Sequence, residues 1–360
     1  MNKRRVLNRQ FVVLLALSLI IIISIFKIPK YRKEVKLSSL GYQKEEVKLI
    51  FKRKLDKEII SNEYYSPYLA SSLAKDDFKA KYLGLYAESD EVNDKIIALY
   101  ERLKALRAYD DRELIKLFAN LPTYGITPLL VYEKVNIEDY ISDYQSHEDN
   151  SADNLVLTAN YLFKDYNKAA LIENPQDDSY ISFRYGLGDY EPSKLVTIPQ
   201  RYAVNGQSLT SISLKAFTDM CDALARDVKG EGIYAVNSYK SYASQVDIYK
   251  RYGLDADDYV DRPGYSDAQL GESVEVVSSL TATIKDFDTT ASYKYLLEHA
   301  HEFGFINRYP LGKEKVTGYK GNPSYWRYVG EELATAIKKS GLTFDEYYYM
   351  YLYKIPEVTK

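Results

Sequence analysis

Two stretches in the last third of the chain decide the fold. The first is Asp261-Arg-Pro-Gly-Tyr-Ser-Asp-Ala-Gln-Leu-Gly-Glu-Ser-Val-Glu-Val-Val277, and the second, from Lys315 to Gly330, ends Asn322-Pro-Ser-Tyr-Trp-Arg-Tyr-Val-Gly330. Valines and polar residues alternate at the end of the first stretch, which predicts a strand. Val274 and Val276 would then lie in the core, and Ser273 and Glu275 would share the opposite face.

Both stretches resemble the zinc-site motifs of the VanY-like D-alanyl-D-alanine carboxypeptidases, which trim peptidoglycan stem peptides. The resemblance covers about residues 155–353, and Ser266, Gln269 and Gly271 fit the first motif. A further segment, 238–245, is similar to the family's Ser-Gly-Tyr-Arg-Ser-x-x-x-Gln. There Lys240 replaces the arginine that is taken to receive the substrate's carboxylate, and lysine lacks the planar bidentate fork of arginine. The cleft residues that the resemblance implies are Ser238, Lys240, Ser266, Gln269 and Arg327.

The resemblance also identifies the positions at which competent relatives hold zinc. The three ligand positions carry Ala268, Glu275 and Tyr325, and the general-base position carries Asn322. Zinc hydrolysis needs three protein ligands, an open position for water and a carboxylate base. Alanine has no lone pair, tyrosine is a poor zinc ligand, and asparagine is not a base at ordinary pH. We therefore expect a degenerate family member with no catalytic residue and no zinc cofactor.

The remaining candidate ligands offer no clear replacement. His299 and His301 are two apart in segment 295–305, which we predict to be helical, so they would point in different directions. His147 falls in a polar loop. Three acidic residues could attract a hard cation such as calcium, and the alternative is a solvated acidic rim; these residues are Asp267, Glu272 and Glu275.

Composition excludes several function classes. The chain has 48 basic and 51 acidic residues, so no electrostatic argument favours nucleic acid as a partner. Motifs of serine hydrolases, P-loops and dinucleotide-binding folds are absent. The single cysteine, Cys221, falls in an apolar helical pattern and is expected to be a buried, inert thiol. The 37 tyrosines suit a sugar or peptide surface, or reflect compositional drift.

The N-terminal region predicts a membrane anchor. Residues 1–10 form a basic tail that we expect in the cytoplasm, and residues 11–28 form an apolar run that we interpret as a transmembrane signal anchor. A cleaved signal peptide is the alternative, although no small-x-small site follows. With the resemblance, this predicts a single-pass protein of the bacterial cell membrane with its C-terminal domain outside.

Three regions follow the predicted anchor. Residues 29–145 are expected to be a helical membrane-proximal region, with one apolar face at 96–106 and a cap at Ser89 or Asp90. Its segments 42–51 and 109–118 look alike, either by duplication or by chance. Residues 146–154 are the predicted linker. The carboxypeptidase-like domain then spans 155–356.

Within that domain, three elements are predicted from local patterns. A helix is expected at 214–228 and a strand at 232–237. A capping box at 343–346 should open a closing helix.

The predicted fold is therefore α+β, with an antiparallel sheet flanked by helices in the C-terminal domain, similar to the hedgehog group. The leading function hypothesis is a non-catalytic module that binds peptidoglycan stem peptides or a cell-wall protein. One alternative is an active D,D- or L,D-carboxypeptidase with an altered metal centre, and another is an assembly module with a purely structural role.

Overall fold

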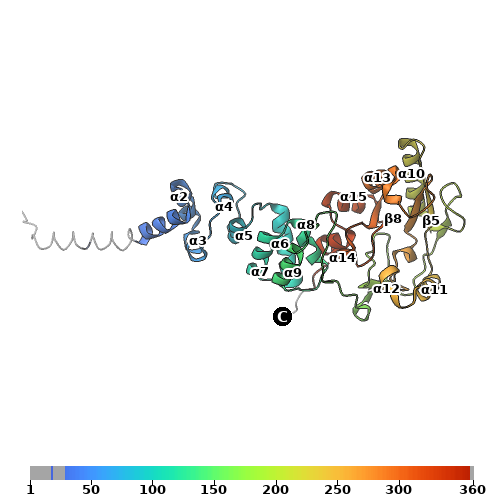
Figure 1. Ribbon diagram of the computed structural model, residues 1–360, viewed down its shortest axis with the longest axis horizontal. Helices are drawn as coiled ribbons and strands as arrows, with labels where there is room; N and C mark the ends of the chain where they lie inside the picture. Colours follow the sequence, from blue (N-terminus) through green and yellow to red (C-terminus); the bar gives the residue numbers. More distant parts are fainter. Residues whose placement is uncertain (1–17, 19–28, 357–360) are drawn as a thin grey trace, which may run out of the picture. The chain divides into compact units, whose positions relative to one another are not determined.

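The computed structural model describes residue 18 and residues 29–356, and it contains two compact units (Figure 1). Unit 1 comprises Met1–Ala98 and Asp111–Asn120, and unit 2 comprises Leu99–Asp110 and Leu121–Lys360. Apart from Ser18, the predicted basic tail and anchor lie outside the described residues. Within the described part, no helix has both the length and the apolar character that a membrane span needs. The predicted domain bounds, with their linker, stay predictions.

Unit 1 is helical, as predicted for this part of the chain. Residues 29–40 are helical and are followed by α2 (Lys44–Arg53), α3 (Asp56–Asn62), α4 (Pro67–Ser72), η1 (Ala80–Tyr82), α5 (Leu83–Glu88) and α7 (Asp111–Asn120). α6 (Asp94–Arg107) begins in unit 1 and ends in unit 2.

α6 buries the apolar face that its spacing predicts, but it begins later than expected. Its buried residues on this face are Ile96, Leu99, Tyr100 and Leu103. The side-chain oxygen of Asn93 accepts a hydrogen bond from the backbone N–H of Ile96 at 3.0 Å. An N-cap directly precedes the first helical residue, so the cap is Asn93, and the prediction of Ser89 or Asp90 was wrong.

The two similar segments form helices at the same offset from a buried tyrosine. α2 begins two residues after Tyr42, and α7 begins two residues after Tyr109. The Tyr42 hydroxyl donates to the carbonyl of Tyr64 at 3.0 Å, whereas the Tyr109 hydroxyl accepts from the N–H of Val135 at 3.1 Å. The shared offset is what a duplicated helical unit would give, and the duplication itself stays a prediction.

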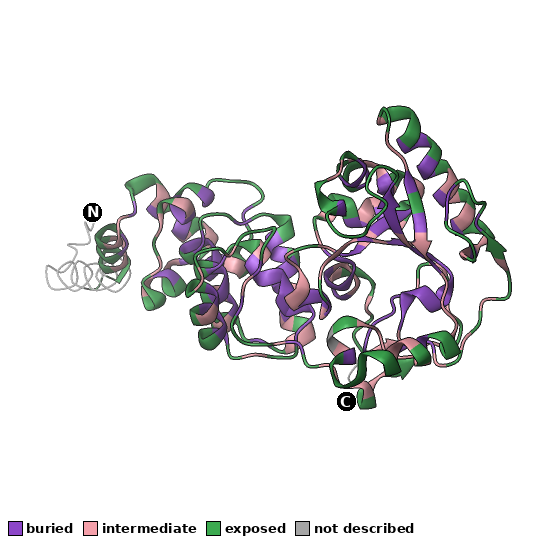
Figure 2. Cartoon of the chain, turned by 45° about the vertical axis from the view of Figure 1, so that its right-hand side comes forward, coloured by how far each residue is buried: buried purple, intermediate pink, exposed green. Residues whose placement is uncertain are grey.

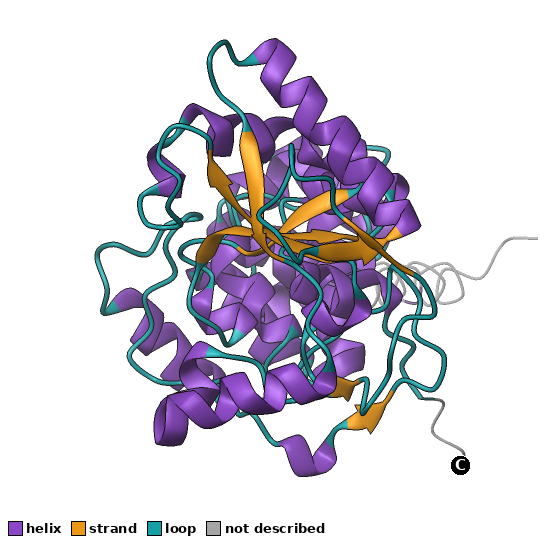
Figure 3. Cartoon of the chain, turned by 90° about the vertical axis from the view of Figure 1, so that its right-hand side faces the viewer, coloured by secondary structure: helices purple, strands orange, loops and turns teal. Residues whose placement is uncertain are grey.

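A four-stranded antiparallel sheet forms the centre of unit 2 (Figure 3), as predicted. Its order is β5 (Ile233–Asn237), β6 (Ser273–Ser278), β8 (Asn322–Tyr328) and β7 (Phe305–Tyr309). β5 confirms the strand predicted at 232–237. The sheet brings the two stretches quoted above side by side, because β6 lies in the first and β8 in the second.

One face of the sheet packs against α10 (Ser211–Asp227), the helix predicted at 214–228. The core cluster between them, which belongs to the buried residues coloured in Figure 2, includes Phe217, Met220, Leu224, Val274, Val276 and Trp326. Val274 and Val276 are fully buried, as predicted, and each such side chain contributes roughly 1.5–3 kcal/mol to folding. Side chains alternate along a strand, so Ser273 and Glu275 lie on the other face.

Smaller elements complete unit 2. Its further helices are α8 (Thr123–Ile126), α9 (Ile137–Gln145), α11 (Tyr242–Tyr252), α12 (Ala256–Tyr259), α13 (Ala291–His299), α14 (Glu314–Thr317), α15 (Glu331–Ser340) and α16 (Phe344–Tyr347). Short turns of helix are η2 (Thr127–Leu130), η3 (Tyr166–Lys168), η4 (Gly253–Asp255), η5 (Asp267–Leu270), η6 (Phe287–Thr289), η7 (Ala300–Phe303) and η8 (Tyr348–Leu352). Two small sheets pair β1 (Ala170–Leu171) with β2 (Tyr185–Gly186), and β3 (Leu195–Thr197) with β4 (Ser208–Thr210).

Two local predictions in unit 2 have different outcomes. The capping box is confirmed, because Thr343 and Glu346 exchange side-chain to backbone hydrogen bonds at the start of α16. The helix predicted over 295–305 is too long, since α13 ends at His299. Gly304, at φ 81°, reverses the chain into β7, and a Cβ there would meet the Tyr328 ring at 2.6 Å.

Candidate functional site

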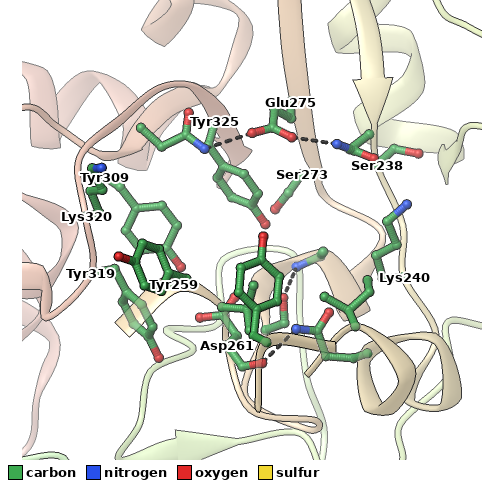
Figure 4. Close-up of a pocket in the computed structure, with 18 residues that line it drawn as sticks. Ser238, Lys240, Tyr259, Asp261, Ser273, Glu275, Tyr309, Tyr319, Lys320 and Tyr325 are labelled. Carbon is green, nitrogen blue, oxygen red and sulfur yellow. Dashed lines mark hydrogen bonds between the residues drawn. The ribbon is translucent and has the colours of Figure 1, made fainter. Parts of the chain in front are cut away.

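A cavity of about 380 Å³ opens on the face of the sheet that Ser273 and Glu275 share (Figure 4). Strands β5, β6 and β8 supply one wall. The other walls come from α11 and α12, from the turn at Asp261, and from the loop around Lys320. The cavity therefore joins the two stretches that the sequence singled out.

Both carboxylate oxygens of Glu275 are engaged by side-chain amides. Its Oε2 accepts from Nδ2 of Asn237 at 2.6 Å, and its Oε1 accepts from Nδ2 of Asn322 at 2.9 Å. The Asn322 amide is oriented by a second bond, because its Oδ1 accepts from the N–H of Ser324 at 3.0 Å. These two contacts, hereafter the amide bridge, link β5, β6 and β8.

Buried hydroxyls without partners face the same cavity. Tyr325 Oη and Ser273 Oγ are both buried, and neither makes a hydrogen bond with a residue that the structure describes. Burial raises the pKa of the Tyr325 phenol well above its ordinary value, so this hydroxyl stays protonated and can donate. An unsatisfied buried polar group costs about 1–3 kcal/mol, which a polar ligand group could recover.

Asp261 lies in the cavity with a perturbed carboxyl group. Burial raises its pKa to about 6; repulsion from Asp267 adds to the shift, and a hydrogen bond with Ser266 opposes it. Its backbone carbonyl accepts from Nε2 of Gln245 at 2.7 Å, which ties the turn to α11. This carboxyl therefore changes charge close to neutral pH.

Comparison with known proteins identifies the family. Residues 206–331 match the family model for VanY, D-alanyl-D-alanine carboxypeptidase. YodJ of Bacillus subtilis (strain 168), provisionally named a carboxypeptidase, is 31% identical over 188 residues, which cover 49% of this chain and 69% of that protein. The chain belongs to the VanY family of D-alanyl-D-alanine carboxypeptidases.

Two further proteins are each similar to about half of the chain. A D-alanyl-D-alanine carboxypeptidase of Enterococcus faecalis (strain ATCC 700802 / V583) is 29% identical over 203 residues, covering 49% of this chain and 72% of that protein. The solved LdcB LD-carboxypeptidase is 31% identical, covers 50% of this chain and 89% of its own, and has a TM-score of 0.47.

The four positions that the resemblance assigns to zinc chemistry gather in this cavity, and their residues do not fit zinc. Ala268, Glu275, Asn322 and Tyr325 all line it. Ala268 offers no donor atom, the Tyr325 phenol is protonated, and both Glu275 oxygens accept from amides. In the described part of the chain, no group of three or more His, Cys, Asp or Glu residues is arranged to hold a metal ion. The absence of zinc in the protein stays a prediction.

Three of the five predicted cleft residues, Ser238, Lys240 and Ser266, line the cavity. The Ser238 hydroxyl is already engaged, because it accepts from the N–H of Ser208 and donates to Oε1 of Gln207, both at 2.9 Å. The ammonium of Lys240 makes no hydrogen bond or ion pair with the described residues. Lys240 is therefore the predicted cleft residue best placed to bind a ligand.

The other two, Gln269 and Arg327, do not line the cavity, and their role in binding stays a prediction. Gln269 is fully buried, and its Nε2 donates to the carbonyls of Gly188 and Tyr190, both at 2.9 Å. Arg327 is fully buried, and its Nε donates to Oδ1 of Asp267 at 3.1 Å. Both side chains hold the scaffold because buried polar groups need partners.

The three acidic residues of the motif region point to different partners. Asp267 is 1% exposed and pairs with both Arg308, at 2.9 Å, and Arg327. Glu272 is also buried, accepts from the Thr210 hydroxyl at 2.7 Å, and has a pKa raised by burial. With Glu275 in the amide bridge, the three form neither a solvated rim nor a shared cation site, and both expectations are corrected.

Histidine and cysteine play no part in the cavity, since none of them lines it. His299 is exposed and pairs with Glu302 at 3.0 Å, and the Nδ1 of His147 contacts the carbonyl of Asp143. Cys221 is buried at 4% exposure, as predicted, and burial raises the pKa of its thiol well above the ordinary value.

Sequence reasoning missed several residues that line the cavity. They are Asn237, Asp261, Lys320 and the tyrosines Tyr252, Tyr259, Tyr309 and Tyr319. Asp261 is the first residue of the first quoted stretch, and Asn237 is the last residue of a predicted strand. Their places next to these two predicted features were the signal that could have identified them. Tyrosine-rich composition pointed to a peptide or sugar surface, but it could not say which of 37 tyrosines would form one.

Proposed function

We propose that this member of the VanY family does not hydrolyse peptides and instead binds peptidoglycan stem peptides, or a cell-wall protein, in its cavity. The observation that carries the proposal is the amide bridge on Glu275. Each oxygen of this carboxylate already accepts from a neutral amide, so binding a metal would require it to share or lose those contacts.

The residue at the base position supports the same conclusion. Asn322 donates its amide hydrogen to Glu275, and an amide cannot take a proton from water at ordinary pH. Nothing else in the cavity repeats the arrangement of a carboxylate beside three metal ligands. The chain therefore keeps the family's frame around a site whose hydrolytic parts have been replaced.

The cavity retains what peptide binding requires. Binding needs a concave site with a few placed polar groups, and here these are the ammonium of Lys240 and the unpartnered hydroxyls of Ser273 and Tyr325. Lys240 supplies a positive charge for a terminal carboxylate, although without the bidentate geometry of arginine.

We also propose that the chain is held in the bacterial cell membrane by residues 11–28, with its C-terminal domain outside. The support is the apolar run between two basic flanks. Protease added to intact cells should digest the C-terminal domain and leave residues 1–10 protected; protection of the whole chain would contradict this orientation.

The test uses the full chain in detergent micelles. We expect no zinc after dialysis, no release of D-alanine from a pentapeptide that ends in D-alanyl-D-alanine, and measurable binding of that peptide by calorimetry. Stoichiometric zinc with turnover that Glu275→Ala abolishes would instead establish the active enzyme with an altered centre. If the protein holds no zinc, shows no turnover and binds neither peptides nor wall proteins, the results would support the assembly module with a purely structural role.

A further inference from the structure

A second cavity lies next to the first, and the two share residues. It measures about 430 Å³ and is lined by residues that include Leu162, Phe163, Lys164 and Lys315. Tyr319 and Lys320 line both cavities, so the two are neighbours along one surface of unit 2. Phe163 is 69% exposed, which leaves an apolar surface beside the second cavity.

The positive charges of the second cavity exceed its available negative charges. Lys315 is half-buried and Lys320 is exposed, and neither ammonium makes a hydrogen bond or ion pair with the described residues. Lys164 differs, because its Nζ donates to the carbonyl of Asp257 at 2.7 Å and covers the ring of Tyr319. Two lysines therefore stay available to a ligand.

The acidic residues of the second cavity already have partners. Glu314 accepts through Oε1 from the backbone N–H groups of Gly321, at 3.2 Å, and Gly312. Both oxygens of Asp257 accept from Arg262, at 2.8 and 2.6 Å, in a bidentate pair. Arg262 therefore compensates the charge of Asp257, and backbone N–H groups hold the Glu314 carboxylate, for which no ion pair with Lys315 or Lys320 is formed among the described residues.

The first cavity also holds an ammonium group that is available to a ligand. Lys240 makes no hydrogen bond or ion pair with the described residues, and the Glu275 carboxylate is held by the amide bridge. Figure 4 shows Lys240 at one side of the first cavity and Lys320 at the other. Within the described residues, ammonium groups without a partner thus lie at one side of the first cavity and where the two cavities meet.

We infer that the two cavities together bind one extended acidic peptide, with its terminal carboxylate at Lys240 and an acidic side chain at Lys315 and Lys320. This inference rests on the proposed function and adds the chemical class of its ligand. Exposure by itself does not distinguish Lys315 and Lys320 from ordinary surface lysines. The shared lining, the occupied acidic residues and the unpartnered Tyr325 and Ser273 hydroxyls distinguish this groove from an ordinary basic surface.

The probes are acetylated pentapeptides that end in D-alanyl-D-alanine and carry glutamate at the first, second or third position. Each has a partner with glutamine in the same place. With the full chain at low salt, the best glutamate peptide should bind about three- to tenfold more tightly than its glutamine partner, an effect typical of one or two partly exposed ion pairs. High salt should reduce this preference.

Two variants test whether the two cavities cause the preference for glutamate peptides. The double change Lys315→Gln and Lys320→Gln should abolish the preference for glutamate, whereas Lys294→Gln, at an exposed lysine of α13, should keep it. Unchanged thermal melting would show that both variants fold.

Failure has two distinguishable forms. If glutamate and glutamine peptides bind equally, or if the double variant keeps the preference, this inference is overturned while peptide binding stands. If no peptide binds at all, the proposed function fails and the inference fails with it.

Discussion

Asn322 donates a hydrogen bond to Glu275 at 2.9 Å, and these residues occupy the positions of the general base and of one zinc ligand in the family resemblance. Two groups that would act on a metal and its water are thus bonded directly to each other. Because Asn237 completes the contact from the neighbouring strand, the bridge also ties three strands together. Glu275 therefore also contributes to the scaffold of the sheet.

The amide bridge should contribute to stability. Glu275→Ala would leave the amides of Asn237 and Asn322 without their acceptor, at a cost of about 1–3 kcal/mol. Urea unfolding should show this loss, whereas Glu298→Ala, which removes a carboxylate that is 71% exposed, should change stability by less than about 0.5 kcal/mol. Equal effects of the two substitutions would mean that the bridge adds no stability.

The buried ion pairs beneath the site should contribute more to the stability of the fold than the amide bridge does. Asp267 joins Arg308 to Arg327, and all three are essentially inaccessible to solvent. Asp267→Asn would leave buried positive charge uncompensated, so we expect a loss of about 3–5 kcal/mol in the free energy of unfolding. The matched control is Asp219→Asn in the exposed pair with Lys215, where no more than about 1 kcal/mol is at stake.

The Asp261 carboxyl predicts a specific pH dependence. Its folded-state pKa of about 6 lies above the ordinary 3.8, so the fold favours the protonated form. This contribution to stability is complete below about pH 4 and is lost as the pH rises through 6. Asp261→Asn should therefore raise the melting temperature relative to wild type at pH 7.5 and have little effect at pH 4.

Asp247→Asn, at an exposed residue of α11, controls for the loss of one negative charge. A gain from Asp261→Asn that is the same at both pH values would contradict the raised pKa.

Restoring the family residues should rebuild a metal site, because the four positions already share one cavity. We expect the variant with Ala268→His, Glu275→Asp, Asn322→Glu and Tyr325→His to bind one zinc ion per chain and to melt at a higher temperature with zinc than without it. Asn322→Glu alone should bind none. If the fourfold variant folds but takes up no zinc, the surrounding frame has diverged as well as the ligands.

Cys221 should be unreactive in the folded protein. Its side chain is buried against the sheet, and its raised thiol pKa leaves little thiolate at pH 8. Maleimide should label it only after denaturant is added. Rapid labelling of the native chain, in the absence of unfolding, would contradict this burial.

The sequence predicted which strands and motif positions form the site better than it predicted the contacts of single side chains. Alternation in 273–277 fixed which residues face the core, because side chains on a strand point to opposite sides in turn. The motif correspondence placed Ala268, Glu275, Asn322 and Tyr325 in one cavity, and the structure brings them there. It did not show that Gln269 and Arg327 make buried contacts with the scaffold, since a motif does not show which way a polar side chain turns.

The sequence by itself determined the family and the antiparallel sheet, because both follow from residue types at fixed spacing. Only the tertiary structure decided which side chains meet in the cavity. Asn237 and Glu275 are 38 residues apart, and Lys240 and Lys320 are 80 apart, so neither relationship has a local pattern to reveal it. Strand pairing and loop packing bring such side chains together, and the contacts between them determine the chemistry of the cavity.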